Sequence, residues 1–231
     1  MFQRLIAGLC THLPSQCAVC HHWPAQLLCE ACVNTFAQPL HRCLTCAKPL
    51  EGVAEHCPQC RKTPPPLDRC LAAVAYSYPW PTVIQEFKFG EETGWARQLG
   101  LLMRSIPWVE PALEAADWVI PMPLSNQRLR ERGFNQALLL ALALEPKKTV
   151  SNAMLRVQHT APQSSLHRNE RLTSLRSAFA MAPEWQPQAR GKQVVIVDDV
   201  MTTGASLHAV ATCLRQAGVA HVTGLVFART E

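Results

Sequence analysis

The sequence contains no apolar run long enough to cross a membrane. Its longest uninterrupted apolar run, residues 137–144, falls far short of the about 20 residues that a membrane-spanning helix needs. The first ten residues form a poor signal peptide, because their apolar stretch is short and no Ala-x-Ala-like cleavage site follows it. We therefore expect a cytoplasmic protein with no membrane span.

Charge is also scarce. Charged residues make up 17% of the chain and hydrophobic residues 48%, which is typical of a folded protein with a real core and excludes a disordered chain. The net charge of +5 is weak evidence for a nucleic-acid or phosphate partner. How the charges are distributed therefore matters more than their sum.

Two nucleotide-binding signatures are missing. An apolar stretch ending in acid, residues 194–199, resembles a Walker B strand, but no Gly-x-x-x-x-Gly-Lys-[Ser/Thr] accompanies it. No Gly-x-Gly-x-x-Gly is present either, so a dinucleotide-binding Rossmann site is unsupported. In phospho-receiver domains an acidic pair opens the fold, whereas here only about thirty residues follow it.

What the sequence does contain is cysteine: eleven residues, ten of them within the first 70. Eight stand in four Cys-x-x-Cys pairs, and such a turn lets two thiolates converge on one ion. Disulfides are disfavoured in a reducing cytoplasm, and the closely spaced third cysteine of a bacterial ferredoxin is missing. The pattern therefore predicts two structural zinc sites, with ligands Cys17, Cys20, Cys29, Cys32, Cys43, Cys46, Cys57 and Cys60.

The pairing of the four turns is open at this point. Sequential pairing encloses short loops and is favoured over a cross-brace, in which the first turn would share an ion with the third. Four thiolates close each site to water and substrate, so the metal is expected to be structural. A segment of about 45 residues with little apolar content could hardly fold without it. Cys10, Cys70 and the histidines near the pairs are expected to be ordinary residues rather than ligands.

A proline run, residues 64–66, predicts a domain boundary. We expect a double zinc-ribbon domain over residues 1–66 and an α/β domain over residues 67–231. Strands are expected at residues 71–78, 117–124, 177–181 and 194–197, and helices at 82–89, 95–106, 137–144 and 207–217. Their alternation favours a parallel sheet, in which ligands bind at the carboxyl ends of the strands.

The most informative stretch is residues 194–206. Four β-favouring apolar residues run into Asp198 and Asp199, and hydroxyl residues around Gly204 then lead into a helix. A loop at a helix N-terminus offers backbone N–H groups and the positive end of the helix dipole to a phosphate. The stretch therefore predicts a strand, an acidic turn, a phosphate-sized loop and a helix.

Three other segments carry candidate cations. Arg128, Arg130 and Arg132 follow the expected strand at 117–124 and are placed to meet an anion, although a solvated helix face is an equal alternative. The long polar segment 156–172 is typical of a lid and carries further arginines. Lys88, between two phenylalanines, is interpreted as a surface lysine rather than a phosphate ligand.

The stretch 194–206 closely resembles the phosphoribosyl pyrophosphate (PRPP) loop of type I phosphoribosyltransferases. This resemblance implies that Asp198 and Asp199 hydrogen-bond the two ribose hydroxyls and that Mg²⁺ clamps the pyrophosphate, mostly through ligand oxygens and water. Residues 128–132 would hold the pyrophosphate, and Arg168 and Arg171 would stabilise the departing charge. The loop around the 5-phosphate would consist of Met201, Thr202, Thr203, Gly204, Ala205 and Ser206.

The whole chain is similar to the ComF/GntX family. The resemblance rests on the four zinc knuckles, Arg-Leu-Arg-Glu-Arg-Gly-Phe-Asn-Gln at 128–136, Thr-Ala-Pro-Gln at 160–163 and the PRPP-type loop. It implies a double zinc ribbon joined to a type I phosphoribosyltransferase domain, and a role in DNA uptake or use. One departure is Ser206, where threonine is commonest, and it keeps the hydroxyl.

Two functions remain open from the sequence. The first is a Mg²⁺-dependent phosphoribosyltransferase that takes PRPP or a phosphoribosyl nucleotide; whether it turns over is left undecided, because regulators share the loop. The second is a non-catalytic nucleotide- or single-stranded-DNA-binding module that works with DNA-uptake proteins. Its support is the arginine excess of residues 128–132 and 156–176.

Overall fold

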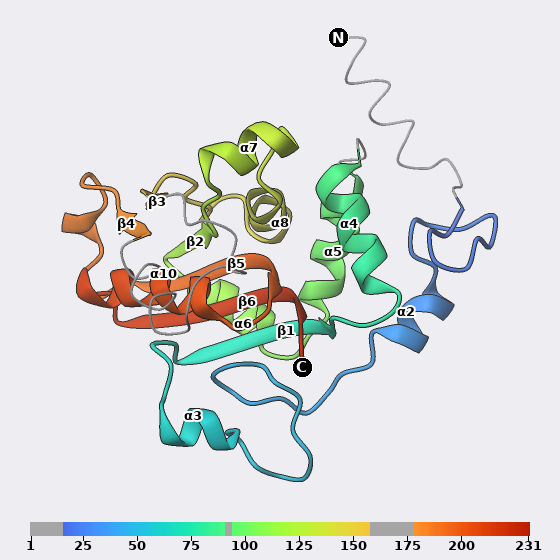
Figure 1. Cartoon of the computed structure of the whole chain (residues 1–231), viewed down its shortest axis with the longest axis horizontal. Coiled ribbons are helices and arrows are strands. Elements are labelled where there is room, and N and C mark those ends of the chain that lie inside the picture. The colour runs from blue at the N-terminus through green and yellow to red at the C-terminus, as the bar shows by residue number, and fades with distance from the viewer. Residues whose placement is uncertain (1–15, 91–93, 158–177) are drawn as a thin grey trace, which may run out of the picture. The chain divides into compact units, whose positions relative to one another are not determined.

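The computed structural model describes residues 16–90, 94–157 and 178–231 (Figure 1). The chain forms two compact units that divide between Gln38 and Pro39. This division separates the first two cysteine pairs from the last two, whereas the boundary expected at residue 66 keeps all four together; that expected boundary stays a prediction. Within the described residues, every helix is too short or too polar to span a bilayer.

The smaller unit is held by its cysteine turns and one short helix. Helix α2 (Glu30–Phe36) begins directly after Cys29, which occupies the N-cap position in extended conformation. Two backbone hydrogen bonds close the turns before it: Cys17 N–H donates to the His22 carbonyl and Ala18 N–H to the Leu27 carbonyl, each over 3.0 Å. Residues 16–38, the described part of this unit, therefore contain little regular structure.

The larger unit is built on a four-stranded parallel sheet, which confirms the expected α/β fold. Its strands are β1 (Arg69–Ala75), β2 (Trp118–Pro121), β5 (Gln193–Met201) and β6 (His221–Arg229), in the order β1-β6-β5-β2. The sequence expectations included no strand after the last helix, and β6 corrects them. Its apolar run, residues 224–228, is buried along its whole length because β6 lies between two other strands.

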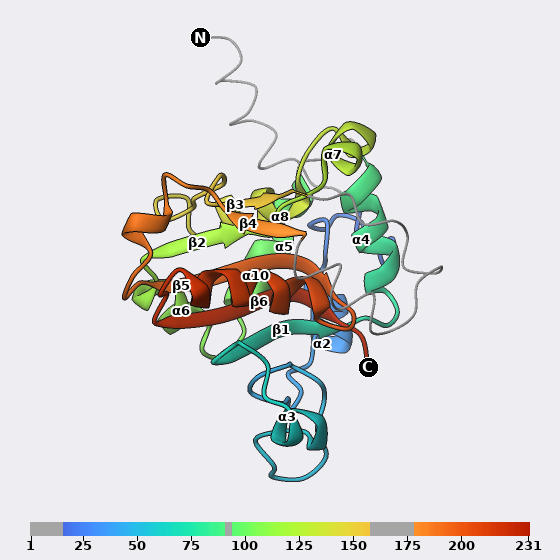
Figure 2. The same ribbon diagram turned by 60° about the vertical axis from the view of Figure 1, so that its left-hand side comes forward.

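Alternate residues of β5 pack on the two opposite faces of the sheet. Val194 and Ile196 share one hydrophobic cluster with Leu207 and Val210 of the following helix. Val195 and Val197 are equally buried but point to the opposite face, since side chains alternate along a strand. Figures 1 and 2 show helix α10 (Ala205–Gln216) in front of the sheet and helices α5 and α6 behind it. The four-residue apolar run before the acidic pair is thus explained by burial on both faces.

The other elements largely follow the expected positions, with small changes at their ends. Helices α4 (Trp80–Phe89), α5 (Gly94–Arg104) and α8 (Gln136–Leu144) match three expected helices. Helices α6 (Val109–Ala115) and α7 (Asn126–Arg132), the short helix η1 (Gln186–Gln188) and strand β3 (Met154–Arg156) were not assigned from the sequence. Strand β4 (Phe179–Met181) pairs antiparallel with β3 in a separate small sheet.

The third and fourth cysteine pairs belong to the core of the larger unit. Helix α3 (Pro58–Lys62) carries Cys60, and all four cysteines of these pairs are buried in the cluster that also contains the α10 residues. Cys70 N–H, on the edge strand β1, donates to the Leu44 carbonyl over 2.7 Å. A cysteine turn therefore covers part of a sheet edge that would otherwise expose unpaired backbone groups.

Candidate functional site

The eight paired cysteines form two separate groups of four. In each group the sulfur atoms all lie within 4.8 Å of one another. Among the described residues no histidine belongs to either group. The sequential pairing is therefore the one that the structure shows, and the cross-brace alternative is wrong. The first cluster is Cys17, Cys20, Cys29 and Cys32, and the second cluster is Cys43, Cys46, Cys57 and Cys60.

Backbone N–H groups favour the thiolate form of one cysteine in each cluster. Cys29 N–H donates to Cys17 Sγ over 3.4 Å, and Cys57 N–H donates to Cys43 Sγ over 3.3 Å. Burial alone would raise the pKa of Cys17 and Cys43, but the N–H donors outweigh it and lower these pKa values to about 6 and about 5. The thiolate is the form that binds metal.

The neighbouring thiols resist ionisation for as long as no cation is present. Burial, and then contact with the other sulfurs and the nearby thiolate charge, raises the pKa of both Cys32 and Cys46. Four thiolates at this spacing therefore need a cation among them. A divalent metal with four sulfur ligands fits this donor set.

The acidic pair lies at the carboxyl end of β5, within the strand rather than in a turn after it. Asp199 N–H donates to Asp198 Oδ1 over 2.9 Å, and Val200 N–H donates to Asp199 Oδ1 over 2.7 Å. Burial, and then the charge of Asp199, raises the pKa of Asp198 well above its ordinary value. Carboxyl oxygens accept hydrogen bonds from hydroxyl groups, which suits a diol.

The loop after the acidic pair borders a pocket. Its lining consists of Asp198, Val200 and residues 201–207. Gly204 precedes the first residue of α10 with φ of 80°, and a Cβ added there would lie 2.4 Å from Met201 Cε. Glycine is therefore favoured at this position by its backbone conformation, and a Cβ there would also have to displace the terminal methyl group of Met201. The expected order of acidic pair, loop and helix is confirmed.

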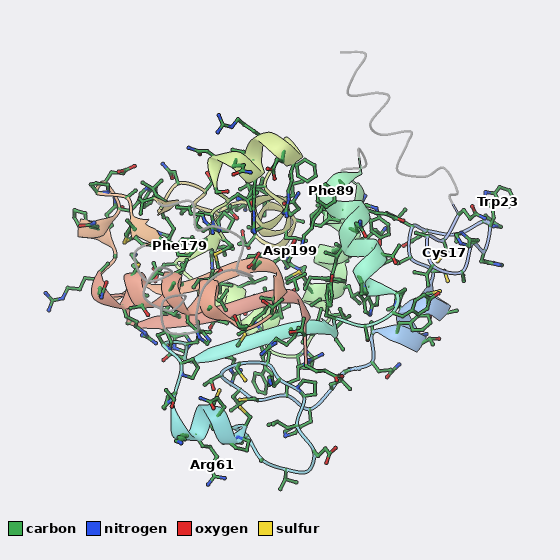
Figure 3. All side chains as sticks on the ribbon, in the orientation of Figure 1. Cys17, Trp23, Arg61, Phe89, Phe179 and Asp199 are labelled. Carbon is green, nitrogen blue, oxygen red and sulfur yellow. The ribbon has the colours of Figure 1, made fainter. Side chains whose placement is uncertain are left out.

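Lys88 corrects the expectation of a surface lysine. Its Nζ lies 2.9 Å from Asp199 Oδ2, and the two side chains are only 20% and 13% exposed. Figure 3 shows Asp199 beside α4, with Phe89 at the end of that helix. The sequence placed Lys88 on an amphipathic helix, but it could not show that the end of this helix meets the end of β5.

The segment 132–136 helps to position the end of α4 where it meets the end of β5. Gln136 is buried; its Nε2 donates to the Lys88 carbonyl over 3.3 Å, and its Oε1 accepts from Arg132 Nη1 over 3.0 Å. Arg132 also lies over the ring of Phe89, with Cζ 5.5 Å from the ring centroid. Gly133 ends α7 with φ of 76°, so the chain can turn directly into the next helix. Much of this segment therefore connects α7, α8 and the end of α4.

The three arginines of α7 differ in their surroundings. Arg132 is partly buried, which lowers its pKa, while the charge of Asp199 acts in the opposite direction. Arg128 and Arg130 are exposed. All three come from the segment after β2, whose carboxyl end adjoins that of β5, since Pro121 pairs with Val197. Arg168 and Arg171 lie outside the described residues.

Two residues beneath the loop, His208 (partly buried) and Arg229 (buried), were not identified from the sequence. His208, in the first turns of α10, would lie 3.0 Å (Nε2) from a Cβ at Gly204, and burial lowers its pKa to about 4. Arg229, at the end of β6, is 3% exposed and donates to backbone carbonyls of the loop. The sequence does contain a pattern that could have identified Arg229, because this arginine directly follows the apolar run 224–228.

The larger unit has the fold and the loop of a phosphoribosyltransferase domain. A parallel sheet carries an acidic pair at the end of one strand and a glycine loop at the start of the next helix. The family model of the phosphoribosyl transferase domain matches residues 136–230 of this chain. That range contains α8, the acidic pair, the loop and β6.

Relatives resemble the chain over nearly its full length. It is 32% identical to competence protein F of Haemophilus influenzae over 203 residues, which cover 84% of this chain and 87% of that protein. It is 29% identical to the DNA utilization protein YhgH of Salmonella typhimurium over 94% of this chain and 98% of that protein. Competence protein ComFC of Bacillus subtilis is 37% identical over 44% of this chain and 40% of that protein. The chain belongs to the ComF family.

Proposed function

We propose that the chain binds PRPP, or a phosphoribosyl nucleotide, at the end of β5 and serves the use or uptake of DNA. The observation that carries this proposal is the pocket itself, which Asp198 and residues 201–207 line at the start of α10. Carboxyl groups there suit ribose hydroxyls, while hydroxyl groups, backbone N–H groups and the helix dipole suit a phosphate. The DNA role is carried over from the relatives, which are named for competence and DNA utilization.

The cations around the pocket fit a ligand of high negative charge. Lys88 already forms an ion pair with Asp199, and Arg132 lies close enough for the Asp199 charge to influence its pKa. A ligand that hydrogen-bonds Asp199 would release the Lys88 ammonium for one of its phosphate oxygens. Mg²⁺ would be held mainly by ligand oxygens, with few protein ligands. Arg128 and Arg130 remain the proposed contacts of a pyrophosphate.

The metal of the two cysteine clusters is proposed to be zinc in a structural role. Each cluster supplies four sulfur ligands and no open position, which is typical of structural rather than catalytic zinc. Thiols kept free for metal imply a reducing compartment, which agrees with the proposed cytoplasmic location. Metal analysis of the purified protein should return two zinc ions per chain.

Titration of the zinc-loaded protein with PRPP and Mg²⁺ tests the binding site. We expect a saturable isotherm that Asp199→Ala weakens at least tenfold, because the variant loses a hydroxyl acceptor and leaves Lys88 without its partner. Asp117→Ala is the matched control: this carboxylate precedes β2 and is bonded to Gln193 N–H and Lys192, at the opposite end of the strands. Equal effects of the two variants, or no binding by the parent, would refute the assignment.

Turnover is tested separately from binding. A panel of nitrogenous bases is incubated with PRPP, Mg²⁺ and the protein while pyrophosphate is measured. Release of pyrophosphate with one base identifies an enzyme and its acceptor. Binding of PRPP without release with any base supports the non-catalytic alternative.

That alternative has one structural observation in its favour. Arg128 and Arg130 are exposed on α7, in the segment that follows β2. If they bind the backbone of single-stranded DNA, affinity should fall steeply with salt, and the double substitution to alanine should reduce the salt slope by about one to two. Salt-independent binding, or none, would exclude this function.

A further inference from the structure

Arg229 connects the second cysteine cluster to the loop through backbone carbonyls. Its Nε donates to the carbonyl of Cys46 over 2.9 Å. Its Nη1 donates to the carbonyl of Met201 over 3.2 Å and also to that of Thr202. One side chain that is 3% exposed thus contacts a metal-binding turn on one side and the start of the phosphate loop on the other.

These bonds fix the direction of two consecutive peptide planes. In a trans peptide the C=O of one residue and the N–H of the next point in opposite directions. When Arg229 holds the carbonyls of Met201 and Thr202, the N–H groups of Thr202 and Thr203 must point away from Arg229. Both threonines line the pocket. Arg229 therefore orients the kind of backbone donor that a phosphate requires.

A second line of contacts runs beside the first. Cys70 N–H donates to the carbonyl of Leu44, between the ligands Cys43 and Cys46. The thiol of Cys70 lies 3.6 Å from Met201 Sδ, and Met201 Cε packs where a Cβ of Gly204 would lie. The same turn of the second cluster therefore supports the loop in two ways: through the hydrogen bonds of Arg229, and through the apolar contacts of Cys70 and Met201.

The charge of Arg229 also needs an explanation. Among the described residues of the larger unit, no carboxylate forms an ion pair with it, and the hydrogen bonds that it donates go to carbonyl and hydroxyl oxygens. A buried cation without a counter-charge is costly. Four thiolates around Zn²⁺ carry a net charge of about −2. The metal-loaded second cluster would thus supply the negative charge that the carbonyl partners lack.

We propose that Arg229 is a positioning residue that couples the second cysteine cluster to the phosphate loop, so that metal in the cluster and a phosphate in the loop stabilise each other. The coupling has two halves: the effect of the metal on the loop (the loop half), and the mutual effect of the metal and a phosphate ligand (the ligand half). Only the ligand half rests on the proposed function. Coupling between two sites is reciprocal, and typical values change affinity about 5- to 150-fold. Loss of metal from the second cluster would therefore weaken ligand binding without removing any residue of the pocket.

The loop half is tested by hydrogen exchange without any ligand. The peptide containing residues 201–206 is followed in the full chain with Cys17→Ser and Cys20→Ser, so that only the second cluster binds zinc. We expect faster exchange of this peptide after zinc is removed, while the peptide covering β2 changes little. Equal exchange with and without zinc would overturn the proposal, whether or not PRPP binds.

The ligand half is tested by zinc release to a chromophoric chelator, with ribose 5-phosphate as the probe. We expect saturating ribose 5-phosphate to slow release at least fivefold in the same chain. If a titration shows binding but the release rate stays the same, the coupling is refuted and the proposed function stands. If ribose 5-phosphate and PRPP both fail to bind, the proposed function is refuted, and hydrogen exchange alone decides the role of Arg229.

Two variants assign the effect to Arg229. Arg229→Lys keeps the charge but loses the planar fork that reaches both carbonyls, so we expect zinc to stay bound and the fivefold slowing to disappear. Arg42→Lys is the matched control, because Arg42 Nη1 donates to the Ala47 carbonyl of the same turn over 3.0 Å. An intact effect in Arg229→Lys, or an equal loss in Arg42→Lys, would contradict the assignment. The parent measurements remain decisive if a variant fails to fold.

Discussion

The two cysteine clusters have the same composition and spacing type but different surroundings. In the first cluster Cys20 is exposed and Cys29 partly exposed, and the described residues around it, 16–38, contain one short helix. In the second cluster all four cysteines are buried in the main hydrophobic core, together with residues of α10. The same motif is thus partly open to solvent in one place and part of the hydrophobic core of the α/β unit in the other.

Because of this difference, a metal is expected to have a different structural role in each cluster. Around the first cluster, the described residues 16–38 contain only Cys17, Leu28 and Cys32 among the buried apolar side chains, so metal binding there is expected to order a short segment. Around the second cluster, the metal-binding turns contact β1 and Arg229 and so take part in the packing that shapes the pocket. The consequences of losing each metal should therefore be very unequal.

The largest test of this comparison is the removal of one ligand from each cluster. Cys43→Ser should destabilise the larger unit by several kcal/mol and lower its unfolding temperature by about 10 °C or more. Cys17→Ser, the matched change, should leave that transition within about 2 °C of the parent. Differential scanning calorimetry measures both. Similar shifts in the two variants would show that the clusters are equivalent.

A smaller effect distinguishes a glycine of the phosphate loop, Gly204, from a glycine in the second cluster's own connecting segment, Gly52. Gly204 and Gly52 both have positive φ, but a Cβ at Gly204 would lie 2.4 Å from Met201 Cε and one at Gly52 would meet nothing within 4 Å. Gly204→Ala should cost about 2–3 kcal/mol, whereas Gly52→Ala should cost about 1 kcal/mol from backbone conformation alone. Urea denaturation measures the difference, and equal costs would mean that Met201 moves aside freely.

The smallest effect concerns charge at the pocket of the larger unit. Because the pKa of Asp198 is raised in the folded state, its ionisation lowers stability as pH rises above its ordinary pKa of 3.8. Asp198→Asn should therefore raise the unfolding temperature by about 2–4 °C at neutral pH, and by nothing below pH 3.8, while weakening PRPP binding.

Asp117→Asn gives the opposite sign and serves as the control. The N–H of Gln193, and then Lys192, lowers the pKa of Asp117, so its ionised form stabilises the folded state. This stabilisation is complete above the ordinary pKa and disappears as pH falls through the lowered value. The variant should lose stability at neutral pH and match the parent in acid. A pH series of thermal melts would contradict both assignments if the two variants shifted in the same direction.

Sequence reasoning predicted the local structure of the candidate site because local chemistry is strongly constrained there, whereas the roles of its residues stay predictions. The Cys-x-x-Cys spacing predicted the two clusters, and residues 194–206 predicted strand, loop and helix with their order intact. It missed β6, a central strand, because the apolar run 224–228 was given no assignment. Lys88 was interpreted as a surface residue, since periodicity shows which face of a helix is polar but not what that face meets.

By itself, the sequence determined the fold class, the eight paired cysteines, and the order of acidic pair, loop and helix, since each depends on residues close together in the chain. Only the tertiary structure decided which cysteine turns lie together, that the second cluster lies in the core, and that Lys88 meets Asp199. It also decided that Arg229 joins Cys46 to Thr202, residues more than 150 positions apart in the chain. Such contacts arise when strands distant in sequence become neighbours in one sheet, and no local pattern records them.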